Sequence, residues 1–387
     1  MRKLIWYVLI FIMLQACTNK QISDSNIRGK ITGAQKQHIF IEELTVNDLL
    51  RIDSSFVDDN GNFEFNIKPD EAGIYLLKLE NAKFVTLVLD KRDHLDIQSD
   101  IITFPDKYKI IGNRGSEALA RYFNETSGNQ DDLDSLSKVF RSSTQNKDFY
   151  KIKLSVDSSF AELYAQQQRN ARQLIEEYPN SLASVLLINQ QFGNKKLFTV
   201  DNDLALMQLI DSCLMNAYPG NSHVVAHHQR VTKILTLQQQ QIETEARLAP
   251  GQPAPYLSLP DLSGKQVSLQ SLQGKLVLIN FWASYSPPCR AANIQLKEIH
   301  QQYNSKGFEV YAVSFDQNNM IWSDVIKMEN FDWINVIDVS GTKSHIKNLY
   351  NVPEELPFYY LIDREGKIIT KGSRISDIEK NLIEKFN

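Results

Sequence analysis

One apolar segment constrains the fold of this chain more than any other feature. Residues 276–281 read Leu-Val-Leu-Ile-Asn-Phe, without the polar alternation of a half-exposed strand. Such a run is typical of a strand that is buried on both faces of a sheet. Two prolines, Pro287 and Pro288, then interrupt the chain, and a helical pattern follows from Cys289 to about residue 303. Because proline is well tolerated in the first turn of a helix, we expect Cys289 just inside a helix that begins at the carboxyl end of the strand.

The residues that join this strand to the helix form a specific motif. The stretch 281–290, Phe-Trp-Ala-Ser-Tyr-Ser-Pro-Pro-Cys-Arg, resembles the active-site loop of thioredoxin-fold thiol–disulfide oxidoreductases of the TlpA/ResA kind. In that family the motif Trp-Cys-x-Pro-Cys-Arg carries the reaction, with a nucleophilic first cysteine and a resolving second one. Here Tyr285 replaces the tryptophan and Ser286 replaces the nucleophile, and only Cys289 keeps its thiol. The resemblance therefore implies the fold together with a site that has lost its attacking sulfur.

Two further positions depart from the pattern that the resemblance implies. The family continues as Cys-Arg-x-Glu-x-Pro, and its buried glutamate exchanges a proton with the resolving cysteine. This chain has Ala292 at the glutamate position and Ile294 at the proline position. A serine nucleophile at 286 would need a base, and His300 lies eleven residues past Cys289, about three helical turns away. The helix N-terminus favours a Cys289 thiolate, so slow monothiol chemistry stays open.

The resemblance also assigns a cis-proline, which in the family borders the client-binding groove. Pro357 stands at that position, directly before the expected strand 358–362, and Leu356 replaces the usual threonine. The alternative is an ordinary trans proline in a turn. The residues that the resemblance places against a client are Trp282, Tyr285, Pro287, Pro288, Leu356 and Pro357.

The amino terminus has the pattern of an export signal. A basic head precedes the apolar run 4–14, which is too short for a permanent membrane span. Leu-Gln-Ala-Cys at 14–17 resembles the lipobox of bacterial lipoproteins, so lipidation of Cys17 and anchoring to the outer membrane are expected. Thr18 gives no inner-membrane retention signal of the aspartate type. An ordinary secretory signal with an incidental cysteine is the alternative.

The remaining chain divides into four further parts. Residues 18–26 form a polar tether, and residues 27–115 contain short alternating runs that predict an all-β domain, an antiparallel sandwich or barrel. The stretch 53–65 in this part resembles a domain of unknown function that often precedes thioredoxin modules in such lipoproteins. Residues 116–247 have helical periodicity and predict four to six helices. The proline-rich stretch 249–255 then opens a thioredoxin-like module, residues 248–387.

Other candidate sites in these parts are weaker. Asp58, Asp59 and Asn60 lack the spacing of a calcium loop and predict a hairpin turn. His223 and His227 are spaced i, i+4, but no third ligand lies at matching spacing, and no metal or cofactor is predicted. Cys213 stands among apolar residues and is interpreted as a small core residue.

Composition restricts the function classes. The 387-residue chain is long enough for several domains, and its net charge of −4 without a basic block excludes a nucleic-acid-binding surface. Three functions are compatible with the sequence. The favoured one is an envelope lipoprotein that binds polypeptide clients or partners without turning over disulfides. The others are a weak monothiol enzyme acting through Cys289 and a purely architectural envelope protein.

Overall fold

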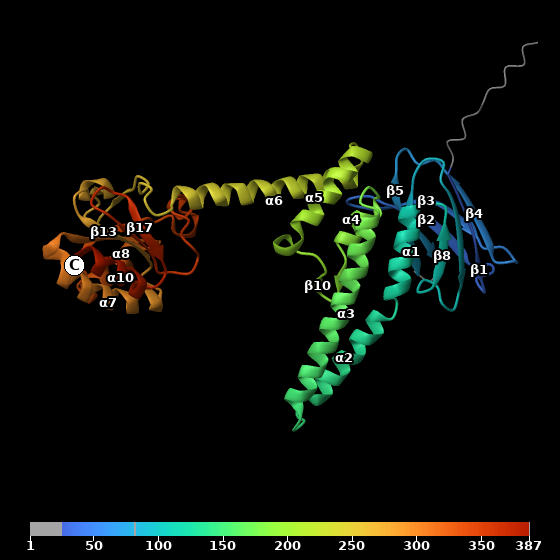
Figure 1. The fold of residues 1–387 in the computed structure, drawn as a ribbon, viewed down its shortest axis with the longest axis horizontal. Coiled ribbons are helices and arrows are strands. Elements are labelled where there is room, and N and C mark those ends of the chain that lie inside the picture. The colour runs from blue at the N-terminus through green and yellow to red at the C-terminus, as the bar shows by residue number, and fades with distance from the viewer. Residues whose placement is uncertain (1–24, 81–82, 387) are drawn as a thin grey trace, which may run out of the picture. The chain divides into compact units, whose positions relative to one another are not determined.

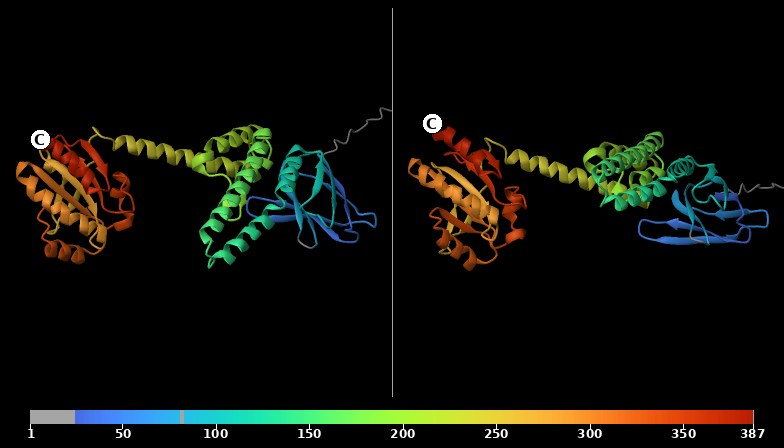
Figure 2. Two further views of the ribbon diagram at one scale, coloured as in Figure 1. Left: turned by 60° about the horizontal axis from the view of Figure 1, so that its bottom comes forward. Right: turned by 90° about the horizontal axis from the view of Figure 1, so that it is seen from below.

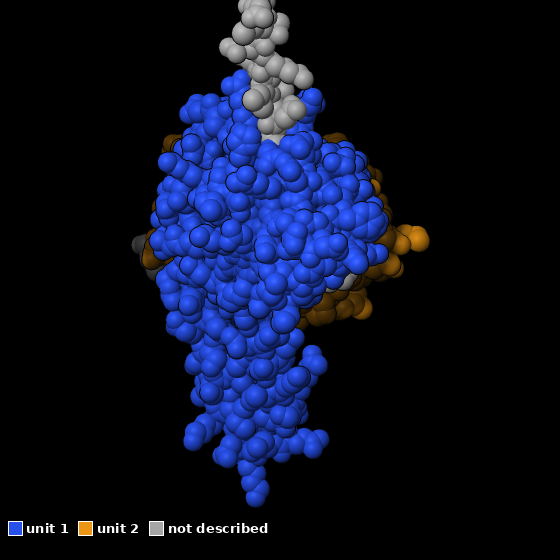
Figure 3. All heavy atoms as spheres, turned by 90° about the vertical axis from the view of Figure 1, so that its right-hand side faces the viewer, with its two compact units in different colours: residues 1–235 blue, residues 236–387 orange. Residues whose placement is uncertain are grey.

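The computed structural model describes residues 25–80 and 83–386. The chain divides into two compact units, unit 1 (residues 1–235) and unit 2 (residues 236–387), coloured blue and orange in Figure 3. The signal segment, Cys17 and most of the tether lie outside the described residues. Within the described ranges, no helix combines the length and the apolar character that a bilayer span requires.

Unit 1 begins with two four-stranded sheets, which Figure 2 shows in blue. Their strand orders are β3-β2-β5-β6 and β4-β1-β7-β8. The sandwich is as expected, but β1 pairs with β7 in parallel rather than antiparallel, and the short strand β8 was not predicted. The strands are β1 Ser25–Thr32, β2 His38–Leu44, β3 Leu49–Phe56, β4 Asn62–Ile67, β5 Gly73–Leu79, β6 Phe84–Leu89, β7 His94–Asp100 and β8 Tyr108–Ile111.

Alternating side chains build the core of the sandwich. Strand β4 buries Phe63, Phe65 and Ile67 and exposes the residues between them. The chain turns tightly before β4, and there Asp58 accepts hydrogen bonds from the backbone N–H groups of Asn60 (2.8 Å) and Asn62 (2.7 Å). The turn is not the expected hairpin, because it joins β3 and β4, which belong to different sheets. The Asp58 carboxylate is used within this turn.

Helix α1, Arg114–Thr126, contacts the outer strands of both sheets, β6 and β8. Figure 1 shows α1 beside β8. The Ser116 hydroxyl accepts a hydrogen bond from Val88 N (2.8 Å) and donates one to Val88 O (2.7 Å). The Asn124 amide does the same for Tyr108, with distances of 3.1 Å to the backbone N and 2.6 Å to the backbone O. Because an edge strand otherwise presents unpaired backbone groups, one helix closes one edge of each sheet.

Five further helices complete unit 1 and lead into unit 2. Helices α2 and α3 lie side by side as a hairpin (Figure 1), and α6 begins in unit 1 and ends in unit 2. Six helices agree with the expected four to six. Their bounds are α2 Asn129–Ser143, α3 Phe149–Glu177, α4 Ala183–Ile188, α5 Val200–Ala217 and α6 Ser222–Arg247, with a two-stranded hairpin of β9 Gln191–Phe192 and β10 Lys195–Lys196 between α4 and α5.

The histidines of α6 have separate partners. His223 Nε2 lies 2.7 Å from Leu44 O, and His227 Nε2 lies 3.1 Å from Met207 O. In the part of the chain that the structure describes, no three metal-binding side chains cluster. Cys213 on α5 is half-buried rather than a core residue, so that interpretation was wrong. Its neighbour Leu214 takes the buried position on the helix.

Unit 2 contains a five-stranded sheet of order β15-β14-β13-β16-β17, with parallel pairing of β13 to β14 and antiparallel pairing of β13 to β16. This is the expected thioredoxin-like arrangement, preceded by a β11–β12 hairpin. The elements are β11 Ser258–Pro260, β12 Gln266–Ser268, β13 Leu276–Trp282, α7 Pro287–Tyr303, β14 Phe308–Ser314, α8 Asn319–Glu329, β15 Ile334–Ile337, α9 His345–Leu349, β16 Phe358–Ile362, β17 Ile368–Gly372 and α10 Ile375–Phe386, with short 3-10 turns η1 Leu269–Leu272, η2 Asn304–Lys306 and η3 Gly341–Lys343.

Strand β13 is buried along its whole length. Leu276, Leu278 and Trp282 face a core that includes residues of α7, α8 and α10. Residues 277, 279 and 281 face a second core, which includes residues of α9 and of the segment before the sheet. The lack of polar alternation in the sequence is thus explained, because each side chain of the strand meets one of two apolar layers.

A buried charged group lies near the start of β14 in this sheet. Glu309 on β14 accepts hydrogen bonds from Lys275 Nζ (2.9 Å) and from His300 Nε2 (3.2 Å). Burial raises the pKa of Glu309, but the hydrogen bonds from His300 and Lys275 outweigh it and lower the pKa to about 2. The folded state therefore favours the ionised carboxylate.

We expect the stability of unit 2 to depend on pH through Glu309. A folded pKa below the unfolded value stabilises the fold above the unfolded pKa of about 4.3, and this contribution disappears as the pH falls toward about 2. In Glu309→Gln, the free energy of unfolding should depend less on pH in this window. Urea unfolding followed by tryptophan fluorescence reports on this unit, since Trp282, Trp322 and Trp333 all lie in it. Glu298→Gln, an exposed position on α7, is the control, and equal pH slopes in both variants would contradict the assignment.

Candidate functional site

Three segments of unit 2 meet at the carboxyl end of β13. They are the loop after β13, the segment after β14 and the segment before β16. The loop 283–286 follows β13 directly, and the segment after β14 begins beside it because Trp282 pairs with Ser314. Strand β16 runs antiparallel, so Pro357 precedes the pair Phe281–Phe358 at the same end. Ser286, Cys289 and Pro357 are thereby brought to one end of the sheet, as the resemblance implied. The peptide bond between Leu356 and Pro357 is cis, which confirms that expectation.

Ser286 takes a different role from that of a usual helix cap. It occupies the N-cap position of α7, but its side chain caps no backbone N–H. The first two helical residues are prolines and have no N–H group to be capped. The Ser286 side chain lies near the Cys289 thiol and lowers its pKa, although burial raises that pKa more. The residue at the nucleophile position is therefore a half-buried hydroxyl, and the remaining thiol of the motif is buried behind the loop.

The Cys289 thiol is shielded and held in its neutral form. Its side chain is completely buried. Burial raises the pKa of Cys289 most, and the nearby Asp316 carboxylate raises it further, against hydrogen bonds from Ser286 and from the Ala283 backbone. Because the thiolate is the reactive form, this environment disfavours attack on a disulfide.

The interior behind Cys289 contains amides and a phenol. Asn293, one helical turn beyond Cys289, accepts a 2.8 Å hydrogen bond from the side chain of Asn280 on β13, and both residues are fully buried. Tyr359 lies opposite Asn280 across the sheet and is also fully buried. Burial and then the nearby Cys289 raise the pKa of Tyr359. With the half-buried Ala292 at the family's glutamate position, that position supplies no carboxylate to accept the proton of Cys289.

A buried aspartate anchors the loop between β13 and α7. Asp316 accepts hydrogen bonds from Ser284 N (2.9 Å) and Ser284 Oγ (2.7 Å), and also from the Ser314 hydroxyl. All three residues are buried. The anchor fixes the loop in front of Tyr285 and Ser286, and its carboxylate oxygens are already occupied by these donors.

The predicted client-binding residues differ in exposure. Tyr285 is 70% exposed, and both prolines of the motif are also exposed. Leu356 is half-buried and Pro357 is buried. Trp282 has no exposed surface and packs edge-on against Phe331, with 5.9 Å between ring centroids. Its side chain is thus unavailable to a client, contrary to the expectation, because it packs in the core that β13 shares with α7, α8 and α10.

Sequence reasoning missed the anchor and the buried amide pair. Asp316 follows β14 and contacts Ser284, which is 32 residues earlier in the chain. The sequence signal was a single polar residue, Asn280, within an otherwise apolar strand. Its partner is Asn293, a polar residue on the buried face of α7. A polar residue on a fully buried strand requires such a partner.

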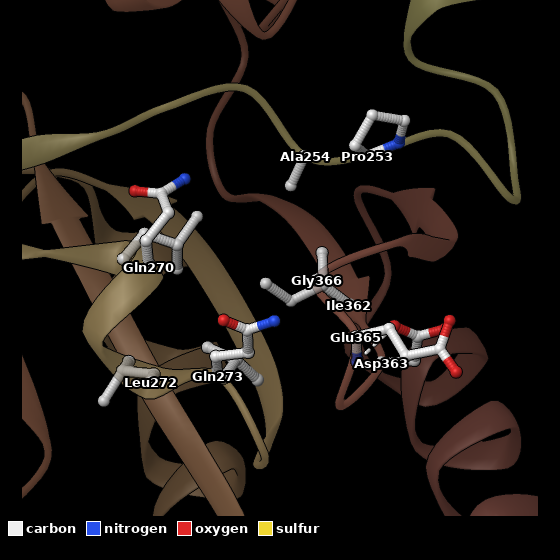
Figure 4. A pocket seen from close by; sticks show the side chains of 11 residues that line it. Pro253, Ala254, Gln270, Leu272, Gln273, Ile362, Asp363, Glu365 and Gly366 are labelled. Carbon is white, nitrogen blue, oxygen red and sulfur yellow. Dashed lines mark hydrogen bonds between the residues drawn. The ribbon is translucent and has the colours of Figure 1, made fainter.

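A separate cavity of about 190 Å³ lies elsewhere in unit 2 and contains none of the predicted site residues. Figure 4 shows its walls, with Pro253 and Ala254 on one side, Gln270 and Gln273 on another, and the β16–β17 turn opposite. Residues 251–254 are held there by pairing with β17, including Gly251 N to Ile368 O at 2.7 Å. The cavity therefore lies next to the segment that leads into the sheet, apart from the Ser286 loop.

The fold and the motif loop together define a thioredoxin-like domain with a modified thiol site. Residues 250–371 match the AhpC/TSA family. The thiol-disulfide oxidoreductase ResA of Bacillus cereus is 30% identical over 153 residues, which are 39% of this chain and 86% of that protein. The chain therefore belongs, through its carboxyl-terminal part, to the ResA family of thiol-disulfide oxidoreductases.

Solved structures from two Bacteroides species cover the same part. A thiol-disulfide oxidoreductase from Bacteroides fragilis is 30% identical and covers 34% of this chain and 98% of that structure, with a TM-score of 0.33. The thioredoxin domain of a thiol-disulfide oxidoreductase from Bacteroides vulgatus is 33% identical and covers 36% of this chain and 98% of that structure, with a TM-score of 0.32.

We expect Cys289 to react slowly with iodoacetamide in the native protein. Its burial requires local opening before alkylation, so its labelling should be on the order of 100-fold slower than that of the half-buried Cys213. Peptide mapping by mass spectrometry distinguishes the two thiols. Asp316→Asn should accelerate the labelling of Cys289, because it loosens the loop and removes a charge that disfavours the thiolate. Asp324→Asn on the exposed face of α8 should not. Equal labelling of both thiols in the unmodified protein would show that Cys289 is accessible.

Proposed function

We propose that this chain is an exported envelope lipoprotein whose thioredoxin-like module binds polypeptide clients without exchanging their disulfides. One observation carries the proposal: a serine stands at the nucleophile position, and Cys289, the thiol that remains in the motif, is fully buried. The fold of an oxidoreductase is thus combined with a loop that presents no exposed sulfur. A binding function requires the fold and the surrounding surface but not the nucleophile.

The chemistry of disulfide exchange supports a redox-inactive module. A reductase attacks a client disulfide with a thiolate, holds the mixed disulfide, and resolves it with a second thiolate. Ser286 forms no covalent bond to a client sulfur, so the first step has no reagent. Cys289 on its own would need to be exposed and ionised, and its burial and raised pKa oppose both. These features disfavour the monothiol alternative.

The surface around the loop supports client binding. The exposed Tyr285, Pro287 and Pro288 form an apolar rim in front of the buried thiol, and the half-buried Leu356 lies at the same end of the sheet. Exposed apolar residues that cluster at one end of a domain are typical of an interaction site. The backbone at Pro357 completes this surface. An architectural role would place no requirement on these side chains.

Export and anchoring rest on the sequence of the amino terminus. The short apolar run and the lipobox at residues 14–17 support cleavage before Cys17 and attachment to the outer membrane. A lipid anchor would hold the module at the membrane surface, where exported polypeptides pass as clients.

We expect no catalysis of insulin disulfide reduction by the unmodified protein. Ser286→Cys should restore part of the activity, because it returns a thiol to the N-terminus of α7. Resolution should stay slow, since Ala292 offers no proton acceptor, and a mixed disulfide should accumulate. Ser286→Cys/Ala292→Glu should turn over faster than the single variant. The measurement is a turnover assay with quantification of the mixed disulfide.

The same proteins provide the controls. A carboxymethylated insulin B chain, whose cysteines are blocked, should bind equally to the unmodified protein and to Ser286→Cys. Turnover by the unmodified protein that disappears in Cys289→Ser would replace the proposal with monothiol chemistry. Absence of binding to the blocked chain would favour an architectural role.

We expect the mature chain to begin at a lipidated Cys17. Mass spectrometry of the protein from a bacterial envelope should find a diacylated or triacylated cysteine as the first residue. Cys17→Ser should release the protein from the membrane fraction while leaving the fold of unit 2 intact. An unmodified amino terminus elsewhere in the first thirty residues, or an uncleaved signal, would refute this expectation.

A further inference from the structure

A groove of about 330 Å³ lies on the α8 side of the motif loop. It forms where β13 and β14 end, and it is bordered by the first turn of α8 and by η3. Leu356 and Pro357 do not line it, so it is distinct from the surface next to the cis-proline. Its lining residues are Tyr285, Phe315, Gln317, Asn318, Ile321 and Gly341, with Asp316 at the base.

The walls of this groove are largely apolar. Tyr285 is 70% exposed and Ile321 is 54% exposed. Phe315, the first residue after β14, is buried. Exposing apolar side chains to water is unfavourable in free energy, and a ligand that covers them removes this unfavourable contribution. A ligand that covers Tyr285 and Ile321 together therefore gains from burying both.

The polar groups of the groove carry no free charge. The Asp316 carboxylate is occupied by Ser284 and Ser314. Asn318 uses its side-chain oxygen to cap α8, accepting from Met320 N (3.0 Å) and Ile321 N (3.2 Å). The exposed Gln317 amide, in contrast, makes no hydrogen bond among the described residues. One uncharged donor and acceptor pair is thus available to a ligand.

Gly341 allows Gln317 to lie against the groove wall. It has φ of +57°, and a Cβ atom built on it would lie 2.7 Å from Gln317 Nε2 and 2.9 Å from Gln317 Cγ. Any side chain at position 341 would therefore push the Gln317 amide away. The positive φ also favours glycine at this position.

We propose that this groove binds one large uncharged apolar side chain of an extended polypeptide client, with the Gln317 amide pairing to the client backbone beside it. This inference rests on the proposed client-binding function and specifies what is recognised. The groove volume is near the lower end of small-ligand pockets, which suits one side chain rather than a folded domain. Recognition of this kind requires no cysteine in the client, which agrees with a loop that has no nucleophile.

Photo-crosslinking of the full chain tests the proposal. The probe is a cysteine-free twelve-residue peptide of serine and threonine with one central benzoylphenylalanine, whose crosslinks are mapped by mass spectrometry. Crosslinks should fall on Tyr285, Gln317 or Ile321. A competing peptide with central phenylalanine should suppress them, and one with central aspartate should not.

Matched substitutions on α8 separate the groove from the general surface. Ile321→Asp should lower the crosslinking yield roughly tenfold, since it places a charge where an apolar side chain is buried. Met320→Asp is the control, because Met320 is 74% exposed on the same helix and does not line the groove. The pair Ile321→Ser and Met320→Ser repeats the comparison with a smaller change, and tryptophan fluorescence verifies that each variant is folded.

The outcomes distinguish the two proposals. Crosslinks confined to Leu356 and Pro357, or equal losses in the Ile321 and Met320 variants, would overturn the groove and leave client binding intact. Binding of the carboxymethylated insulin B chain without any crosslink of the peptide would also overturn the groove alone. Failure of both probes to bind would overturn the client-binding function itself.

Discussion

The burial of β13 between two apolar layers is the constraint on which unit 2 depends. Each of its seven residues is buried, and its alternate side chains enter different cores. A strand of this kind requires neighbours on both edges and cover on both faces, so it determines where β14, β16, α7 and α9 must lie. The motif loop begins at the end of this strand. Its position is therefore fixed by the core even though its residues differ from the family motif.

Much of the fold followed from the sequence because period and burial are local properties. Alternation in β4 and the continuous apolar run of β13 predicted their environments, and the motif predicted the cis bond before Pro357. The parallel pairing of β1 with β7 was not predictable, since it depends on which distant strand becomes the neighbour. Dependence on distant neighbours also explains why some site residues were not predicted from the sequence. Asp316 acquires its role only when β14 places it beside Ser284.

Trp282 shows how a motif can mislead when it is separated from its strand. Its position in the motif suggested a surface role, but the alternation of β13 directs its side chain inward, where it meets Phe331. Tyr285, only three residues later, has left the strand and is exposed. Ser286, at the N-cap of α7, makes no side-chain cap, and the two prolines that follow it carry no N–H group. Position relative to the strand end, more than residue type, decides which side chains face outward.

Helix α1 has a consequence for how such chains are assembled over evolutionary time. Its Ser116 and Asn124 complete the hydrogen bonding of Val88 and Tyr108, on strands from two different sheets. A sandwich inherited without this helix would expose two edge strands with unpaired backbone groups, and such edges pair with strands of other chains. Gene fusion or domain shuffling at residue 115 would thus be selected against, and the sandwich and its first helix should travel as one inherited block.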